Sequence, residues 1–326
     1  MATDINGTSR LGFDPVKFKP VFKRRLLHNT ILSRITNDEF SGEFVGQGTT
    51  LEIPIEPLVA TRQRKQGDPI NYQHVNGTTE KFSVGRQAYI AFVIEREEQK
   101  FSAIGDLAGQ FMTFGKTQRL PELEREYYAD IYAKCATENQ GNTAGYISGS
   151  YDLGAATTPT YIYKTGADAT ASAQTHKEAA PDYMCHLVNT LREQPGGENL
   201  TPWIIVPTVV ADRIQTSELK QADLAGDDIS LVRKDIRYIG DLGGAHVYVS
   251  NLTPVIPKVD GAGAQPTRYV CLAGDNSAVT YFGDTSEIEV GLKDINVRGT
   301  FNRAFWDYEW FVRYPERLAT GIVAIG

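Results

Sequence analysis

The stretch from Thr49 to Glu95 constrains the fold most, because it has the pattern of two long strands joined by a polar tip. In both arms apolar residues recur at every second position, as in half-buried strands. The apolar face of this loop consists of Leu51, Ile53, Ile55, Phe82 and Val84, and its parity continues through Ala88, Ile90, Phe92 and Ile94. An arm of roughly 14 residues would reach about 45 Å. Because so long a two-stranded ribbon is marginal in water, we expect its apolar face to lie on another surface, such as a second copy of the chain.

Length and composition favour a globular protein of about two domains. The chain has 326 residues, of which 41% are hydrophobic and 22% charged, as in ordinary globular proteins. No apolar run approaches the roughly 18 residues of a membrane span, and Met1–Arg10 lacks the apolar centre of a secretory signal. We therefore expect a soluble protein made in a cytoplasm, without membrane contact. The formal net charge of −7 argues against binding nucleic acid over the whole surface.

Two helices are predicted after the ribbon. Ser102 is a suitable N-cap for the first, which we expect to end at Gly115. The second begins at Pro121, a residue that suits the first turn of a helix. Three acidic residues, Glu122, Glu124 and Glu126, complement its positive N-terminal end. Its apolar stripe consists of Leu120, Leu123, Tyr127, Ile131 and Cys135. Part of residues 13–35 is also expected to be helical.

The second half of the chain alternates helix and strand patterns. A helix is predicted from Pro181 to the Pro-Gly-Gly run at 195–197, a buried strand at 203–206 and another helix at 207–219. Two strands flank the glycine-rich turn at 240–244, and β-patterns with many aromatic residues follow from Tyr269. Residues 145–170 are expected to form short strands or a surface loop rather than core, and 221–228 an acidic loop. This mixture indicates the α+β class.

Motifs for catalysis or cofactor binding fail on their spacing. In the run 109–117 five residues separate the two glycines, whereas a phosphate loop requires four. The five histidines show no metal-ligand spacing. Three cysteines, Cys135, Cys185 and Cys271, are far apart and odd in number, so we expect buried thiols. No G-x-S-x-G elbow occurs. We therefore predict that the chain is not an enzyme and has no metal or cofactor.

An N-terminal arm, a long β-ribbon, a long helix and an α/β segment follow one another in this chain. Its more specific features are a strand ending at Val206-Pro207 before a helix, a glycine turn leading into 247–251, and the closing Tyr314-Pro315-Glu316-Arg317. In this order the chain resembles the major capsid proteins of tailed double-stranded DNA bacteriophages, which share the HK-97-type (Hong Kong 97) fold. The resemblance spans nearly the whole sequence.

The resemblance implies a domain organisation and a function. The domains would be an N-terminal arm (1–36), an extended hairpin loop with its base (37–95), a peripheral domain with a long spine helix at 121–138 (96–142 and 280–314), and an axial α/β domain (143–279 and 315–326). The function would be that of a structural coat protein that self-assembles through pentamers and hexamers into an icosahedral shell. That shell would enclose phage double-stranded DNA, contacted non-specifically, in a virion assembled in the host cytoplasm.

Partners beyond other copies of the chain are implied as well. A portal and a decoration protein are candidates. Because no long coiled-coil or protease-like segment precedes Phe13, we expect a separate scaffolding protein, or a short arm acting in its place, rather than a fused scaffold.

Charges at the loop tip are the predicted inter-subunit contacts. The tip carries Arg62, Arg64, Lys65 and Asp68, and the candidate acidic acceptors on a neighbour are Glu95, Glu97, Glu98, Asp227 and Asp228. Exposed ion pairs contribute only about 0–1 kcal/mol each, so these contacts would set register more than strength. A solvated acidic surface is the other interpretation of the same carboxylates.

Two alternatives belong to other classes. An encapsulin-like compartment would have the same fold but would enclose enzymes. A soluble carbohydrate-binding module or enzyme would use the tyrosine-rich segment 145–170 and the C-terminal aromatic residues, although aromatic residues at such spacings more often form core or interface.

Overall fold

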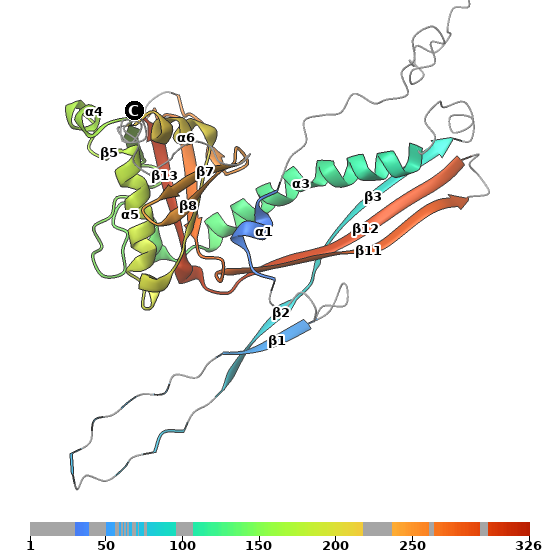
Figure 1. Cartoon of the computed structure of the whole chain (residues 1–326), viewed down its shortest axis with the longest axis horizontal. Coiled ribbons are helices and arrows are strands. Elements are labelled where there is room, and N and C mark those ends of the chain that lie inside the picture. The colour runs from blue at the N-terminus through green and yellow to red at the C-terminus, as the bar shows by residue number, and fades with distance from the viewer. Residues whose placement is uncertain are drawn as a thin grey trace, which may run out of the picture.

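The computed structural model describes residues 30–38, 50–55, 77–95, 107–217, 237–260, 264–293 and 299–326, together with isolated positions between 59 and 74. These residues form an α+β fold in which a helix-covered lobe joins an elongated sheet, with a two-stranded ribbon projecting from the elongated part (Figure 1). The predicted α+β class is confirmed.

The lobe is built on an eight-stranded mixed sheet with the order β5-β4-β13-β10-β6-β8-β7, with β9 paired to β10. Its strands are β4 (Thr160–Tyr163), β5 (Lys177–Ala179), β6 (Trp203–Val206), β7 (Tyr238–Leu242), β8 (Ala245–Val249), β9 (Val255–Ile256), β10 (Arg268–Gly274) and β13 (Leu318–Ile325). Every residue of β6 is buried. A strand covered on both faces needs such a continuous apolar run.

Two hydrophobic clusters cover the opposite faces of this sheet. On one face, Ile204 and Val206 of β6 join the cluster formed with α5 (Ala180–Arg192) and α6 (Thr208–Gln215). On the other face, Trp203 and Ile205 join Tyr127 of α3 (Leu107–Lys134) and the short α1 (Leu32–Ile35). The period-2 alternation of a strand thus divides one buried run between two cores. One further helix, α4 (Gly166–Ala171), and three 3₁₀ turns, η2 (Thr137–Asn139), η3 (Gly197–Asn199) and η4 (Pro315–Arg317), are also formed by the described residues.

The elongated part is a three-stranded antiparallel sheet beneath the long helix α3 (Figure 1). Its order is β11 (Val279–Lys293), β12 (Gly299–Val312) and β3 (Arg86–Glu95). The helix packs on one face of the sheet, where the rings of Phe92 and Phe111 meet edge to face at 5.7 Å.

The helix α3 corrects the prediction of two helices, because it runs without a break through Gly115 and Pro121. A Cβ on Gly115 would lie 2.5 Å from Cδ1 of Ile90, so the glycine allows close approach to β3 instead of ending the helix. Since α3 begins at Leu107, Glu122, Glu124 and Glu126 lie in its interior rather than at its positive end. The predicted stripe is confirmed, with Leu123, Tyr127, Ile131 and Cys135 buried and Leu120 half-buried. The proposed N-cap Ser102 lies outside the described residues.

Replacing Pro121 with alanine should stabilise the chain by about 2 kcal/mol. An interior proline forfeits a backbone hydrogen bond and crowds the preceding turn, at a cost of about 3 kcal/mol, and about 0.4–1 kcal/mol of that is offset by its stiffening of the unfolded chain. Urea denaturation would measure the change. At the first turn of a separate helix proline is well tolerated, so an unchanged or lowered stability would contradict the continuous α3.

The ribbon differs from its prediction as well. β1 (Thr50–Ile55) pairs with β2 (Thr78–Ser83) over six residues, whereas the return arm then leaves β1 and pairs as β3 with β12. The change of partner occurs at Gly85, whose N–H donates to Glu309 of β12 at 3.3 Å, and Arg86 forms an ion pair with the same carboxylate. Side-chain parity is confirmed on both sides of this change, since alternate residues from Phe82 to Ile94 are the buried or half-buried ones.

The remaining predictions are mostly confirmed. The helix after Pro181, the strand 203–206, the helix before 219 and the hairpin around Gly243 all form. In the segment 145–170 a short strand, β4, forms as predicted, but the expectation that the segment lies outside the core is wrong, because Leu153 and Ile162 are fully buried in it. The three cysteines are free thiols, two buried and Cys185 half-buried. Of the predicted helix within 13–35 the structure describes α1 alone, and the acidic loop 221–228 lies outside the described residues.

Candidate inter-subunit surfaces

The predicted charged contacts fall only partly within the described residues. Lys65 and Glu95 are both exposed, Lys65 between β1 and β2 and Glu95 at the far end of β3. The β1–β2 ribbon and the far end of β3 point in opposite directions (Figure 1), so the structure does not bring the two groups together within one chain. The other predicted positions lie outside the described residues: Arg62, Arg64, Asp68, Glu97, Glu98, Asp227 and Asp228.

The apolar face of the loop is partly covered by the chain itself. Phe82 and Val84 are buried, and the ring of Phe82 lies 4.4 Å from that of Phe311 on β12. This contact anchors the base of the ribbon. Ile53 is half-buried, and Leu51 and Ile55 are placed by their backbone register opposite Phe82 and Thr78.

Three apolar side chains between β1 and β2 are exposed, and the sequence analysis did not select them. They are Val59 (61% exposed), Ile70 (59%) and Tyr72 (90%). Exposure of this degree on an extended segment favours contact with a partner, because each side chain would gain about 1.5–3 kcal/mol on full burial. Apolar residues within an otherwise polar tip were the signal that could have identified them.

The face of the three-stranded sheet opposite α3 also carries exposed apolar residues. Tyr89 is 69% and Val93 44% exposed, and Tyr89 lies directly opposite Phe305 in the register. Arg303, which lies opposite Ala91 between Tyr89 and Val93 in the register, forms an ion pair with Glu289. This face and the 59–74 segment are two candidate surfaces for contacts between copies.

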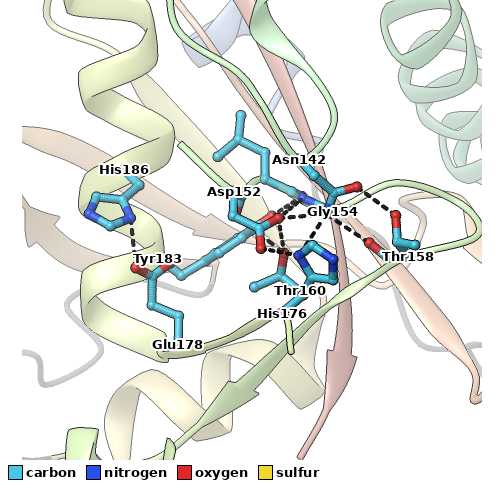
Figure 2. Close-up of polar contacts among 10 residues, drawn as sticks. Asn142, Asp152, Gly154, Thr158, Thr160, His176, Glu178, Tyr183 and His186 are labelled. Atoms are coloured by element: carbon cyan, nitrogen blue, oxygen red, sulfur yellow. Dashed lines mark hydrogen bonds and ion pairs between the residues drawn. The ribbon is translucent and has the colours of Figure 1, made fainter. Parts of the chain in front are cut away.

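In the lobe, Asp152 is the centre of a polar network on the segment 142–160 (Figure 2). One carboxylate oxygen accepts from Asn142 Nδ2 at 2.6 Å and from Thr160 Oγ1 at 3.0 Å. The other oxygen lies 2.6 Å from Nδ1 of His176. The backbone N–H of Gly154 adds a further bond at 3.2 Å.

The hydrogen bonds of this network indicate a structural role and do not provide the arrangement needed for nucleophilic catalysis. The hydroxyl of Thr158 donates to Asn142 and that of Thr160 to Asp152, so neither is activated by the imidazole of His176 (Figure 2). Nucleophilic catalysis would require a hydroxyl or thiol hydrogen-bonded to that base. A second pair, His186 with Glu178, has its nitrogen and oxygen 2.7 Å apart. Among the described residues, no group of three or more histidine, cysteine or acidic side chains is arranged to hold a metal ion.

The tyrosines of segment 145–170 are largely engaged within the chain. Tyr151 stacks on His186 with ring centroids 5.1 Å apart, and the hydroxyl of Tyr163 lies 2.6 Å from that of Ser172. Tyr146 is the exposed exception, at 53%. These contacts do not form the open aromatic platform that a sugar ligand would need.

A buried carboxylate, Glu124, lies in the middle of α3. Its side chain is fully buried and forms a bidentate pair with Arg237 at 2.9 and 3.0 Å. Burial alone would raise the pKa of Glu124, but the hydrogen bonds and charge of Arg237, with the N–H of Ile31, lower it below its ordinary value. Sequence reasoning missed this site, although helical periodicity placed Glu124 between Leu123 and Tyr127 of the apolar stripe.

A lobe with a mixed sheet, joined to an elongated sheet beneath a long helix and a projecting ribbon, is a fold that the chain shares with solved phage capsid structures. A chain from the capsid of cyanophage P-SCSP1u superposes with a TM-score of 0.63 at 14% identity, over 95% of this chain and 93% of that chain. A chain from Mycobacterium phage Che8 gives 0.62 at 16% identity, over 96% and 98%. The mature capsid of bacteriophage PhiM1 gives 0.58 at 12% identity, over 95% and 91%.

These likenesses confirm, at the level of the fold, the resemblance to tailed-phage capsid proteins drawn from the sequence. No family model and no curated protein sequence matches the chain. Within its described residues, no helix has the length and hydropathy needed to cross a membrane.

Proposed function

We propose that the chain is a structural coat protein, the major capsid protein of a tailed phage, which assembles into an icosahedral shell around double-stranded DNA. The observation that carries this proposal is the match in fold over nearly the whole of this chain and of the phage chains at once. A match of both full lengths favours a shared architectural role over a borrowed domain, although fold by itself does not determine function.

The physical basis of assembly is burial of surfaces that one copy leaves exposed. The contact between Phe82 and Phe311 anchors the base of the β1–β2 ribbon, and a neighbour would bury the exposed side chains of Val59, Ile70 and Tyr72. In a closed shell of pentamers and hexamers each such contact recurs in every copy, and closure leaves no unsatisfied edge.

The HK-97-type organisation extends this proposal. The arm 1–36, the loop 37–95, the peripheral domain 96–142 with 280–314, and the axial domain 143–279 with 315–326 would be its parts, with α3 as the spine helix. A scaffolding protein, a portal and a decoration protein would be its partners in the host cytoplasm. The net charge of −7 suits a container, because a wall that bound DNA tightly would oppose packing and release.

Negative-stain electron microscopy with sedimentation, over a concentration series of the purified chain, tests the function directly. We expect capsomers, tubes or shells whose fraction rises with concentration. Shells that copurify with enzymes carrying a shared peptide would instead favour an encapsulin-like compartment. A monomer at every concentration that turns over a substrate or binds a glycan would overturn the proposal.

Substituting serine for Val59, Ile70 and Tyr72 together should raise the concentration at which assembly begins by about tenfold or more, since each 1.4 kcal/mol of lost contact energy is a factor of ten. The melting temperature of the unassembled chain should not change, because all three side chains are exposed. Light scattering and sedimentation would measure the onset. The control is Val209→Ser with Val255→Ser, which removes two exposed apolar residues of the lobe, at 43% and 48% exposure. Equal effects of the two sets would contradict a specific role for the loop.

Reversing the tip charges with Arg62→Glu, Arg64→Glu and Lys65→Glu should reduce shell formation at low salt and restore it near 1 M salt. Charge pairing between exposed groups is screened within about 3 Å at that ionic strength. The glutamine triple variant serves as the control, because it removes attraction without adding repulsion. Normal shells from the reversed tip at both salt concentrations would eliminate the proposed pairing with Glu95, Glu97, Glu98, Asp227 or Asp228.

A further inference from the structure

The carboxylate of Glu124 joins three parts of the chain that are distant in sequence. From its place in α3 it accepts the backbone N–H of Ile31 at 2.9 Å, 93 residues away. It also accepts hydrogen bonds from both terminal nitrogens of Arg237, 113 residues away. The hydroxyl of Tyr128, one helical turn along α3, donates at 3.1 Å.

Two of these contacts, those with Ile31 and Arg237, fix segments that are distant from α3 in the sequence. Ile31 leads directly into α1, whose Leu32 and Ile35 are buried in the cluster with Tyr127. Arg237 leads directly into β7, and its Nε donates to the carbonyl of Val249 on β8 at 2.9 Å. The side chain of Glu124 therefore binds both the residue that precedes α1 and the residue that precedes β7.

Burial makes the two attachments interdependent. Glu124 is fully buried and the side chain of Arg237 is only 11% exposed, so neither charge has bulk water to replace a lost partner. If Arg237 moves away, the carboxylate must take up a proton or admit water. Ile31, whose N–H contacts the carboxylate directly, is one of the groups that keep water from Glu124. If α1 moves first, water reaches the pair and weakens the hold on Arg237.

We propose that Glu124 is a coupling point between residues 30–38 and the β7–β8 hairpin, so that opening one of them opens the other. The coupling belongs to the unassembled chain and does not depend on shell formation. If the proposed function also holds, a neighbour that contacts residues 30–38 would change the opening equilibrium of the β7–β8 hairpin. A neighbour that contacts the hairpin would likewise change the opening equilibrium of residues 30–38.

Hydrogen–deuterium exchange on the unassembled full-length chain tests the proposal. In Arg237→Lys, which keeps the positive charge but loses the two-pronged contact, we expect the amides of Ile31, Arg34 and Thr36 to exchange about fivefold faster or more, together with those of β7 and β8. The matched control is Glu126→Gln on the same helix, whose partners are Arg119 and Tyr308. It should leave residues 31–36 unchanged. Faster exchange in β7 and β8 with unchanged exchange at residues 31–36 would overturn the proposal.

The wild-type chain provides a test that needs no variant to fold. Exchange measured in low concentrations of denaturant gives each amide an opening free energy and a dependence on denaturant. Coupled segments open as one unit, so residues 31–36 and the β7–β8 amides should share both values. Different denaturant dependences for the two segments would show that they open independently and would overturn the coupling.

Discussion

Replacing Arg237 with methionine should lower the free energy of unfolding at pH 7 by about 3–5 kcal/mol, the usual cost of removing one partner of a buried ion pair. The variant leaves the carboxylate of Glu124 fully buried without its cation, although hydrogen bonds from Ile31, Tyr128 and Thr30 remain. Urea denaturation of the unassembled chain would measure the loss.

The effect should depend on pH with a defined sign. In the wild-type chain the pKa of Glu124 is lowered, so its stabilising contribution is present above its unfolded pKa of about 4.3 and is lost as the pH falls through the lower folded value. In the variant burial acts without Arg237 and raises the pKa of the carboxyl above 4.3. That group is destabilising at neutral pH, and the penalty disappears as it takes up a proton. The difference between the two chains should therefore shrink between pH 7 and pH 4.

A double variant separates lost packing from an unpaired charge. In Glu124→Gln with Arg237→Met no charge remains in the site, so much of the stability lost in Arg237→Met should return. If Arg237→Met alone lowers the free energy of unfolding by less than about 1 kcal/mol, the Glu124–Arg237 pair is solvated like a surface ion pair. That result would contradict a buried pair from which water is excluded.

Gly154→Ala should destabilise the chain by about 2–5 kcal/mol. Gly154 has φ of +76°, where a Cβ costs about 1–2 kcal/mol. The added Cβ would also lie 2.1 Å from the carbonyl oxygen of Ile322 and 2.7 Å from the backbone nitrogen of Thr160, and overpacking adds about 1–3 kcal/mol. These contacts are with backbone, which cannot rotate away as a side chain can.

Gly196→Ala is the matched control for that position. Its φ of +79° is nearly the same, but no atom lies within 4 Å of the added Cβ. The control should lose only about 1–2 kcal/mol, so the difference between the two variants isolates the close approach of segment 152–160 to β13. Equal losses would mean that the segment can move aside.

Local patterns predicted the elements whose partners are close in sequence. The helix α5 formed where Met184, Leu187, Val188 and Leu191 recur at helical spacing, and all four are buried. The hairpin β7–β8 formed around Gly243 and Gly244, which both have positive φ. The parity of Phe82, Val84 and Ile94 was also predicted, because alternation is a property of the strand and does not depend on which strand it pairs with.

Predictions failed where contacts with a segment distant in the sequence overrode the local structural preference of a residue. Gly115 and Pro121 are ordinary signals for the end and the start of a helix, yet both lie within α3. The side chain of Ile90 occupies the space beside Gly115, and the packing of α3 on β3 and β12 stabilises the continuous helix. The return arm likewise left β1 for β12 at Gly85, where Glu309 binds Gly85 and Arg86 from the other end of the chain.

The sequence by itself determined the element types and the faces that are buried, because periodicity and turn chemistry are properties of neighbouring residues. The resemblance to phage capsid proteins was drawn separately, from the order in which these elements follow one another. Tertiary structure decided the partner of β3, the continuity of α3 and the burial of Glu124. The bond from Glu124 to Arg237 spans 113 residues. A carboxylate in a helix is ordinarily a surface residue. In the folded chain, Arg237 and Ile31 bind Glu124 and offset the free-energy cost of removing its carboxylate from water.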